Sequence, residues 1–292
     1  MARRPDKGST GIAGRRERSG KPPQGGRAVH PYRDPARQRQ DERARPHPDD
    51  KLVRIAGLPS VAELFETGAD RVERLYFEAA LKAEVQPWCA VLARRRRVYR
   101  QVGAEEMQRV AGTAMHGGIV ALARPRPIRD LDPSAADKWA ADGAPLLILD
   151  GIGNPQNIGA IARTAAFYGL RRLVVSGHPG QAGLSDAAYR VAKGGLEWLD
   201  VYRVHDLPVV LRRLSESYHV VGTAIERGVP PSRLDSKGKP LALVLGNEED
   251  GLPAATLSAC TETVALSGSG HVQSLNVSAA AAILIHTLFA AR

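Results

Sequence analysis

Long apolar runs that end in polar turns dominate the second half of this chain. The runs at 146–149 and 241–245 contain only Leu, Ile, Val and Ala, and each ends in a turn with Gly and Asn. A third polar stretch, 274–278, is also expected to follow a buried strand directly and to start a helix. Continuous apolar runs that alternate with helices indicate a mostly parallel sheet covered on both faces. Because ligands bind beyond the carboxyl ends of the strands in such sheets, we expect the three turns to form one site.

Helices and strands alternate in two regions of the chain, which predicts an α/β protein with two domains. The larger region has five runs with strand character, at 146–150, 173–176, 220–224, 241–245 and 263–266. The smaller region has expected helices at 60–67, 79–93 and 104–110 and expected strands at 72–77, 98–101 and 119–123. A length of 292 residues with 43% hydrophobic content suffices for two buried cores.

Composition sets the expected domain boundaries. Residues 1–50 hold 13 Lys or Arg against 7 Asp or Glu, with 7 Pro, 6 Gly and few large apolar side chains. We expect this tail to be disordered and either to bind a polyanion or to keep the protein soluble. A small domain at 51–124, a proline-rich linker at 125–145 and a larger domain at 146–292 are expected to follow.

Cysteine content and hydropathy indicate the compartment. Cys89 and Cys260 lie far apart in the sequence, so neither a disulfide framework nor a zinc site is expected. The start of the chain lacks a signal-peptide pattern, and the longest apolar helix, at 277–291, is interrupted by Ser278 and His286. We therefore expect a cytoplasmic protein with no membrane span and no metal.

Three motifs occupy the polar turns. Their sequences are Asn-Pro-Gln-Asn-Ile-Gly-Ala-Ile-Ala-Arg-Thr at 154–164, Gly-Asn-Glu-Glu-Asp-Gly-Leu at 246–252 and Ser-Leu-Asn-Val-Ser at 274–278. In these motifs and their order the chain resembles the SpoU/TrmH family of RNA 2′-O-ribose methyltransferases, part of the SPOUT superfamily. The resemblance implies a SPOUT domain with a mostly parallel sheet and a C-terminal trefoil knot. It also implies a homodimer and S-adenosylmethionine as the only cofactor.

The first motif offers Asn157 and Arg163. We expect Asn157 at the N-cap of a helix, where its amide oxygen accepts from a free backbone N–H. Arg163 stands in an apolar run, so its guanidinium must reach outward, and its planar fork of donors suits phosphate or ribose. The resemblance makes both residues catalytic, with Arg163 contacting the RNA and activating the hydroxyl. Because arginine keeps its proton, orienting the hydroxyl and stabilising negative charge are easier roles for it than that of a base.

The second motif begins at Gly246, where we expect the backbone to approach a ligand without interference from a Cβ atom. Glu248 is the first carboxylate of this turn, and it can bind nucleoside hydroxyls or hold Arg163 in place. The resemblance makes Glu248 catalytic and places Gly246 and Asn247 against the cofactor. Glu249 stands where the family usually has glycine.

The third motif places Ser274 and Asn276 on either side of Leu275, directly before a helix. A hydroxyl, an amide and free helix N–H groups should therefore converge there. Helix capping explains one of the two polar residues but not both. The resemblance makes Ser274 and Asn276 catalytic, and it places Leu266, Leu275 and Asn276 against the cofactor. Residues 266–268, Leu-Ser-Gly, replace the family's usual Ile-Pro-Met.

The smaller region resembles, more loosely, a ribosomal-protein-like RNA-binding domain that precedes the catalytic domain in one branch of the family. The matching stretches are Ile-Ala-Gly at 55–57 and His-Gly-Gly-Ile-Val-Ala at 116–121. The arginines at 94–97 and Arg100 either attract RNA phosphates or form a solvated helix end. Such a domain is more typical of enzymes that act on ribosomal RNA, so we expect rRNA as the substrate more than tRNA.

Two other functions fit parts of the sequence. Gly151 and Gly153 follow a strand, as in dinucleotide-binding oxidoreductases, but Gln156 occupies the position of the third glycine of that pattern. The other alternative is a non-catalytic RNA-binding protein that retains the methyltransferase fold. Glu249 and residues 267–268 favour this alternative.

Overall fold

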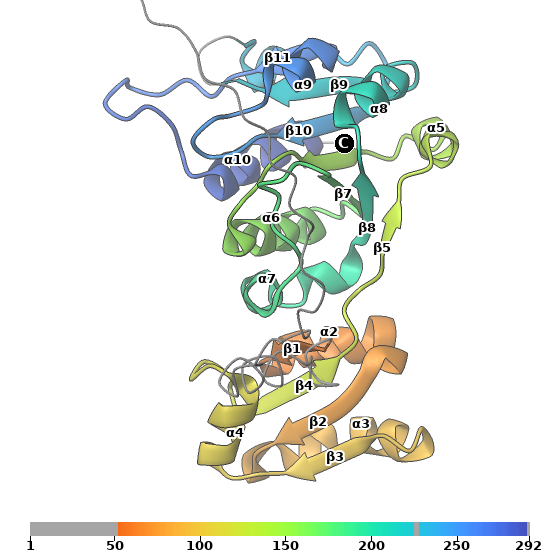
Figure 1. Ribbon diagram of the computed structural model, residues 1–292, viewed down its shortest axis with the longest axis vertical. Coiled ribbons are helices and arrows are strands. Elements are labelled where there is room, and N and C mark those ends of the chain that lie inside the picture. The colour runs from red at the N-terminus through yellow and green to blue at the C-terminus, as the bar shows by residue number, and fades with distance from the viewer. Residues whose placement is uncertain (1–51, 225–227, 291–292) are drawn as a thin grey trace, which may run out of the picture. The chain divides into compact units, whose positions relative to one another are not determined.

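The central strands of the larger sheet contain only apolar residues, because helices cover both faces of this sheet. The computed structural model describes residues 52–224 and 228–290 (Figure 1). β6 (Leu146–Leu149) and β10 (Leu241–Leu245) are buried along their whole length. Alternate residues of both strands point to opposite faces of the sheet and belong to separate cores.

The described part of the chain contains one sheet of seven parallel strands, in the order β11-β9-β10-β6-β7-β8-β5. The other five are β5 (Ile128–Asp130), β7 (Arg172–Ser176), β8 (Asp200–Val204), β9 (His219–Thr223) and β11 (Glu262–Val264). β6 and β10 are neighbours, and Leu149 pairs with Leu245, so both strands end at the same level. After β6 the chain continues to β7 and β8 on one side of this pair, and after β10 it continues to β11 on the other side. Parallel sheets bind ligands at such a point, where the strand order reverses.

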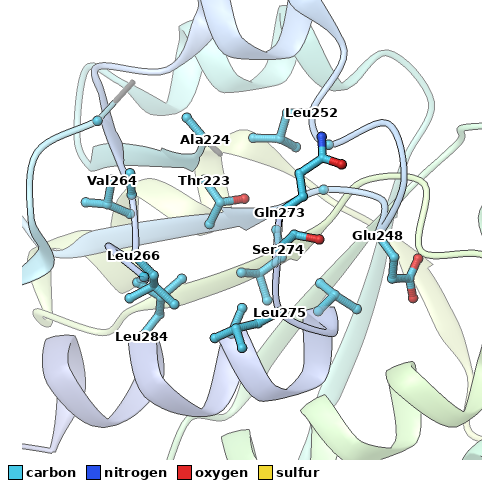
Figure 2. A pocket seen from close by; sticks show the side chains of 18 of the residues that line it. Thr223, Ala224, Glu248, Leu252, Val264, Leu266, Gln273, Ser274, Leu275 and Leu284 are labelled. Atoms are coloured by element: carbon cyan, nitrogen blue, oxygen red, sulfur yellow. The ribbon is translucent and has the colours of Figure 1, made fainter. Parts of the chain in front are cut away.

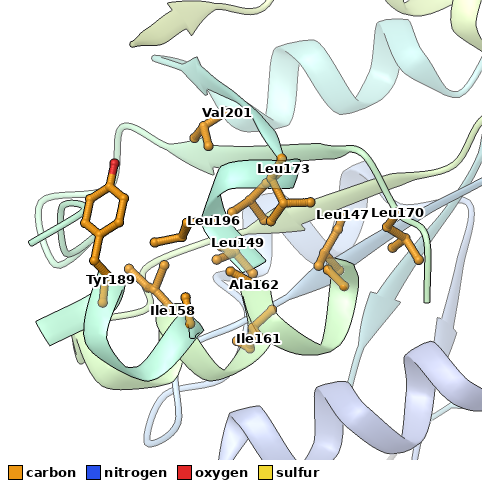
Figure 3. Packing of buried hydrophobic residues seen from close by; sticks show 14 of the residues in the cluster. Leu147, Leu149, Ile158, Ile161, Ala162, Leu170, Leu173, Tyr189, Leu196 and Val201 are labelled. Atoms are coloured by element: carbon orange, nitrogen blue, oxygen red, sulfur yellow. The ribbon is translucent and has the colours of Figure 1, made fainter. Parts of the chain in front are cut away.

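Helices cover both faces of this sheet (Figure 1). One face carries α6 (Pro155–Phe167), α7 (Asp186–Ala192) and α10 (Val277–Phe289), and the other carries α5 (Pro133–Ala141), α8 (Leu207–Leu214) and α9 (Ala254–Ala259). The 3-10 helices η4 (Gly195–Trp198) and η5 (Pro231–Arg233) lie in the connections. Figure 3 shows the first face, where Ile158, Ile161 and Ala162 of α6 pack against Leu147 and Leu149 of β6.

The smaller domain has its own mixed sheet, with the order β1-β4-β2-β3 among the described residues. Its strands are β1 (Val53–Ala56), β2 (Val72–Phe77), β3 (Val98–Gln101) and β4 (Ile119–Ala123). α2 (Leu58–Gly68) and α3 (Lys82–Arg94) cover one face, α4 (Ala104–Ala111) covers the other, and η2 (Ala69–Arg71) and η3 (Ala79–Leu81) are short connections. β4 is antiparallel to both of its neighbours, whereas β3 runs parallel to β2 at one edge.

Charged side chains link residues of the smaller domain to residues of the larger one. The buried Arg71 donates to Glu197 of η4, and Arg126 lies 3.7 Å from the same carboxylate. Burial raises the pKa of Glu197, and the two nearby arginines oppose that rise. At the surface, Arg54 and Asp186 form an ion pair of 3.0 Å.

The strands predicted at 72–77, 98–101, 119–123 and 241–245 are confirmed with the same bounds. The prediction that 125–145 is only a linker was wrong, because this segment contains β5, which pairs with β8, and α5. β1 and β8 were not predicted. The tail predicted to be disordered, at 1–50, lies outside the described residues. None of the helices within 52–224 and 228–290 has the length and apolar character needed to cross a bilayer.

Candidate active site

Asn154 caps α6, and Asn157 does not. The Asn154 side-chain oxygen accepts from the Gln156 N–H at 2.8 Å, and Pro155 occupies the first helical position. The prediction that Asn157 is the N-cap was therefore wrong. Asn157 lies three residues further on, with only 8% of its surface exposed. A buried amide that does not cap its own helix needs hydrogen-bond partners from other elements.

Asn247 closes the turn that follows β10. Its backbone N–H and C=O exchange two hydrogen bonds of 3.0 Å with Gly251. Its side-chain oxygen accepts from the N–H groups of Glu249 and Asp250, and its amide donates to the Gly151 carbonyl at 2.9 Å. The bond to Gly151 ties the second motif to the loop that follows β6.

Gly246 is required by the turn itself. A Cβ atom at this position would lie 2.5 Å from the Gly251 carbonyl carbon and 2.6 Å from the Leu252 nitrogen. We expected a ligand to approach Gly246 closely, but the backbone of Gly251 and Leu252 occupies that position. Gly246 also lines the pocket described below. Glu249 is exposed and does not adopt a positive φ, so the turn accepts a residue other than glycine there.

A loop, and not a strand, precedes the third motif. β11 ends at Val264, and residues 265–276 form neither helix nor strand before α10 begins. The expectation that a buried strand leads directly into this turn was therefore wrong. Asn276 caps α10, because its side-chain oxygen accepts from the Ser278 N–H at 2.9 Å and from the Ser278 hydroxyl at 2.6 Å.

Side chains from the three motifs meet in one chain of hydrogen bonds. The Asn276 amide donates to Asn157 Oδ1 at 3.2 Å, and the Asn157 amide donates to Glu248 Oε1. The oxygen of Asn276 is already engaged in the α10 cap, so both carboxamides are held at both ends. This arrangement fixes the half-buried Glu248 carboxylate and leaves its Oε2 atom to accept from a ligand.

A pocket of about 900 Å³ opens beside Glu248 (Figure 2). Figure 2 shows Glu248 on one side of the pocket and Leu266 and Leu284 on the other, with Leu275 between them. This volume lies within the roughly 300–1,000 Å³ typical of small-molecule and cofactor sites. The described lining contains the carboxylates of Glu248 and Asp250 and no Lys or Arg, so it favours a ligand with positive charge.

Most of the predicted site residues gather around this pocket. The predicted residues that line it are Gly246, Asn247, Glu248, Leu266, Ser274 and Leu275. Asn157 and Asn276 join them through the hydrogen bonds to Glu248. Four further residues, which lie outside the three motifs and were not predicted, also line the pocket: Thr223, Val264, Gln273 and Leu284. Thr223 and Val264 are the last residues of the parallel strands β9 and β11. Because ligands bind beyond the carboxyl ends of such strands, these two residues could have been predicted from the sequence.

The structure does not bring Arg163 to this cluster. Arg163 is exposed and follows Asn157 by six residues on α6, which is about 9 Å along the helix axis and about 120° around it. Its backbone packs against η4, where a Cβ atom on Gly195 would lie 2.8 Å from Arg163 Cα. The guanidinium therefore leaves α6 on a different face from the Asn157 amide.

The two cysteines offer no reactive thiolate to the site. Burial raises the pKa of both thiols, and the pKa of Cys260 reaches about 12 with a further contribution from Asp150. Both thiols are thus protonated at neutral pH. Among residues 52–224 and 228–290, no group of three His, Cys, Asp or Glu is arranged to hold a metal ion. The described polar groups at the pocket supply hydrogen bonds and negative charge.

Two family models match this chain. The SpoU rRNA methylase family model matches residues 144–286, and the model for RNA 2′-O ribose methyltransferase substrate binding matches residues 54–128. The two matches cover the larger and the smaller domain respectively.

Individual proteins resemble the chain over most of its length. The 23S rRNA (guanosine-2′-O-)-methyltransferase RlmB of Acinetobacter baylyi is 35% identical over 193 residues, which is 64% of this chain and 76% of that protein. RlmB of Bordetella pertussis is 30% identical over 234 residues, 80% of this chain and 94% of that protein. The S-adenosylmethionine-bound rRNA methyltransferase from Sinorhizobium meliloti shares the fold, with a TM-score of 0.68 at 19% identity, over 86% of this chain and 89% of that one.

Proposed function

This chain belongs to the SpoU rRNA methylase family, and we propose on that premise that it transfers a methyl group from S-adenosylmethionine to a ribose 2′-hydroxyl of ribosomal RNA. One observation carries the proposal. Asn157, Glu248 and Asn276, each from a different motif, form a single chain of hydrogen bonds at the mouth of a pocket of cofactor size. A fixed carboxylate beside such a pocket suits a reaction between a hydroxyl and a cationic methyl donor.

The pocket fits the methyl donor in size and charge. Leu266, Leu275 and Leu284 offer apolar surface to a purine ring, and the carboxylates of Glu248 and Asp250 complement a sulfonium charge. The turn that Gly246 and Asn247 build holds Glu248 at the pocket edge. When bound, S-adenosylmethionine supplies an electrophilic methyl group, so the protein has to position the acceptor and remove a proton.

Glu248 is the residue we assign to the ribose hydroxyl. Its Oε1 atom is occupied by Asn157, which leaves Oε2 to accept from the 2′-hydroxyl, to orient that oxygen and to take its proton as the methyl group leaves the sulfonium sulfur. Asn157 and Asn276 hold the carboxylate in place through the α10 cap. The Ser274 hydroxyl lines the same pocket and is proposed to position the ribose.

We propose that Arg163 acts through a homodimer. It stands on the exposed face of α6, one turn before Phe167, which is 81% exposed. A large apolar side chain so exposed is stabilised when a second copy covers it. An interface at this face would present Arg163 to the partner's site, where a guanidinium can orient the RNA and stabilise developing negative charge.

Three finer features belong to the same proposal. The C-terminal trefoil knot is proposed from the family resemblance, and α10 packs against both α6 and η5. The smaller domain matches the substrate-binding model, which supports an RNA substrate. Several relatives are named for 23S rRNA and others for tRNA or rRNA, so the names favour rRNA over tRNA. A ribosomal RNA substrate supports the expectation of a cytoplasmic protein.

The test is to incubate the purified protein with radiolabelled S-adenosylmethionine and separate pools of rRNA and tRNA, and then to map the label. We expect 2′-O-methylation at one position of rRNA. Label on tRNA alone would reassign the substrate. RNA binding without cofactor binding or transfer would instead establish the non-catalytic alternative. Because Glu249 leaves the turn intact, only residues 267–268 still favour that alternative.

A further inference from the structure

A second, smaller pocket lies in the smaller domain, away from the three motifs. It measures about 170 Å³. Its lining residues, called the arginine pocket below, are Leu52, Arg54, Arg74, Tyr76, Arg109, Val110 and Leu122. Three arginines and no carboxylate line this space, although it adjoins the apolar core between the sheet and α4.

Strand register explains how two of the arginines come together. Arg54 of β1 and Arg74 of β2 both pair with Leu122 of the central strand β4. Directly paired residues point to the same face of a sheet. Their Cα atoms are therefore two strand spacings apart, roughly 10 Å. Arg109 adds a third guanidinium from α4, the helix that covers this face.

Two of the three arginines in the arginine pocket, Arg54 and Arg74, already interact with other groups of the protein. Arg54 donates to the Val110 carbonyl at 3.0 Å and forms its ion pair with Asp186. Arg109 is exposed and has no hydrogen bond or ion pair with any residue that the structure describes. Like charges that share one small space repel each other, so a bound anion would lower the free energy of the folded state.

Size and donor geometry identify the anion. Guanidinium groups carry planar forks of N–H donors that match the oxygens of a phosphate, and more than one fork can serve the same group. The pocket is smaller than the roughly 300–1,000 Å³ of sites that enclose a whole small molecule. It therefore suits a phosphodiester group that enters from a longer chain better than a free nucleotide.

We propose that the arginine pocket binds a backbone phosphate of the substrate RNA. This proposal rests on the proposed function, because it takes the RNA as the ligand, and it adds a named site within the smaller domain. Phosphate contacts of this kind fix the register and orientation of a nucleic acid without reading its sequence. The pocket would thus position the RNA while the cluster around Glu248 performs the chemistry.

Arg109→Ala is the direct test. Arg109 is exposed on α4 and alanine is the best helix former, so the variant should fold normally. Arg212→Ala is the matched control, because it removes an exposed arginine from helix α8 of the larger domain. The affinity for an rRNA fragment is measured by fluorescence anisotropy at several salt concentrations. We expect Arg109→Ala to weaken RNA binding about tenfold. The slope of log affinity against log salt concentration, called the salt slope, should fall by the value of about one phosphate contact. Arg212→Ala should bind RNA within about twofold of wild type.

The result is separable from a failure of the proposed function. Arg109→Ala could bind RNA with unchanged affinity and salt slope while the wild-type protein transfers methyl groups normally. That result would overturn the phosphate site alone. A weakened Arg109→Ala together with a wild-type protein that methylates no RNA would overturn the methyltransferase assignment alone. Calorimetry with S-adenosylmethionine should give the same affinity for both proteins. Weaker RNA binding with an unchanged salt slope would also contradict a phosphate contact.

Discussion

Single residues of this site serve the fold and the proposed chemistry together. Gly246 gives the second motif a turn in which the backbone doubles back without room for a Cβ atom. Asn157 uses both ends of its amide to join the α10 cap to Glu248. A change at either position should therefore alter the placement of the carboxylate before it alters any contact with RNA.

Gly246→Ala should destabilise the protein and weaken cofactor binding. The added methyl group overlaps backbone atoms that cannot rotate away, and such overpacking lowers the free energy of unfolding by about 1–3 kcal/mol. Urea denaturation measures the stability, and calorimetry measures the affinity for S-adenosylmethionine. Gly183→Ala is the control, since no atom lies within 4 Å of its added Cβ. Equal stability of the two variants would show that the turn tolerates the methyl group.

The sequence indicated the members of the site better than their local roles. The three motifs pointed to a shared site, and the structure brings Asn157, Glu248 and Asn276 together, while their catalytic roles stay predictions. Asn157 was wrongly expected to cap its helix, although Pro155 already marked Asn154 as the cap. The separation of Arg163 from Asn157 could have been predicted, because a spacing of six residues on a helix places two side chains about 120° apart.

Among the elements of the larger sheet, uninterrupted apolar runs were predictable, whereas the strands β5 and β8 were not. β10 lies in the middle of the sheet, so both of its faces are apolar and its bounds follow from composition. β5 has three exposed residues and β8 alternates with polar side chains, so neither has an apolar run to reveal it. The helix α5 could have been predicted, because Asp132 followed by Pro133 is a helix-start signal.

Two substitutions of Asn276 should separate helix capping from the proposed chemistry. Asn276→Ala removes the cap of α10 and should lower the free energy of unfolding by about 1 kcal/mol. Asn276→Asp keeps the cap but loses the donor to Asn157, so we expect near-normal stability with reduced methyl transfer. Thermal denaturation and turnover with rRNA measure the two effects. If Asn276→Asp transfers methyl groups at the wild-type rate, the hydrogen bond to Asn157 has no part in the reaction.

At the scale of the whole molecule, charge and exposed apolar surface indicate two kinds of partner. The chain carries a net charge of +10, which favours association with RNA in a salt-dependent way. Phe167 and Ile283, at the surface of α6 and α10, are exposed apolar side chains on two helices that pack together. The first feature serves the substrate, and the second supports the proposed homodimer.

If the proposed homodimer forms, Phe167→Asp should convert it to a monomer and reduce methyl transfer, because a buried unpaired carboxylate opposes the interface. Sedimentation velocity at micromolar protein concentration measures the assembly state. Val209→Asp is the matched control, since Val209 is a 52% exposed apolar residue on α8, on the opposite face of the sheet. A wild-type protein that sediments as a monomer and remains active would rule out an interface that delivers Arg163.

The rate of methyl transfer to rRNA by Glu248→Gln shows whether the fixed carboxylate takes part in the reaction. The substituted amide keeps an oxygen for Asn157 but removes the negative charge, so the fold and the turn should persist. We expect the single-turnover rate to fall by about 10²–10³-fold, with the affinity for S-adenosylmethionine within a few-fold of wild type. The neighbouring variant Glu249→Gln, altered at an exposed carboxylate, should keep the wild-type rate. If Glu248→Gln methylates rRNA at the wild-type rate, the carboxylate has no part in the reaction and the proposed site is wrong.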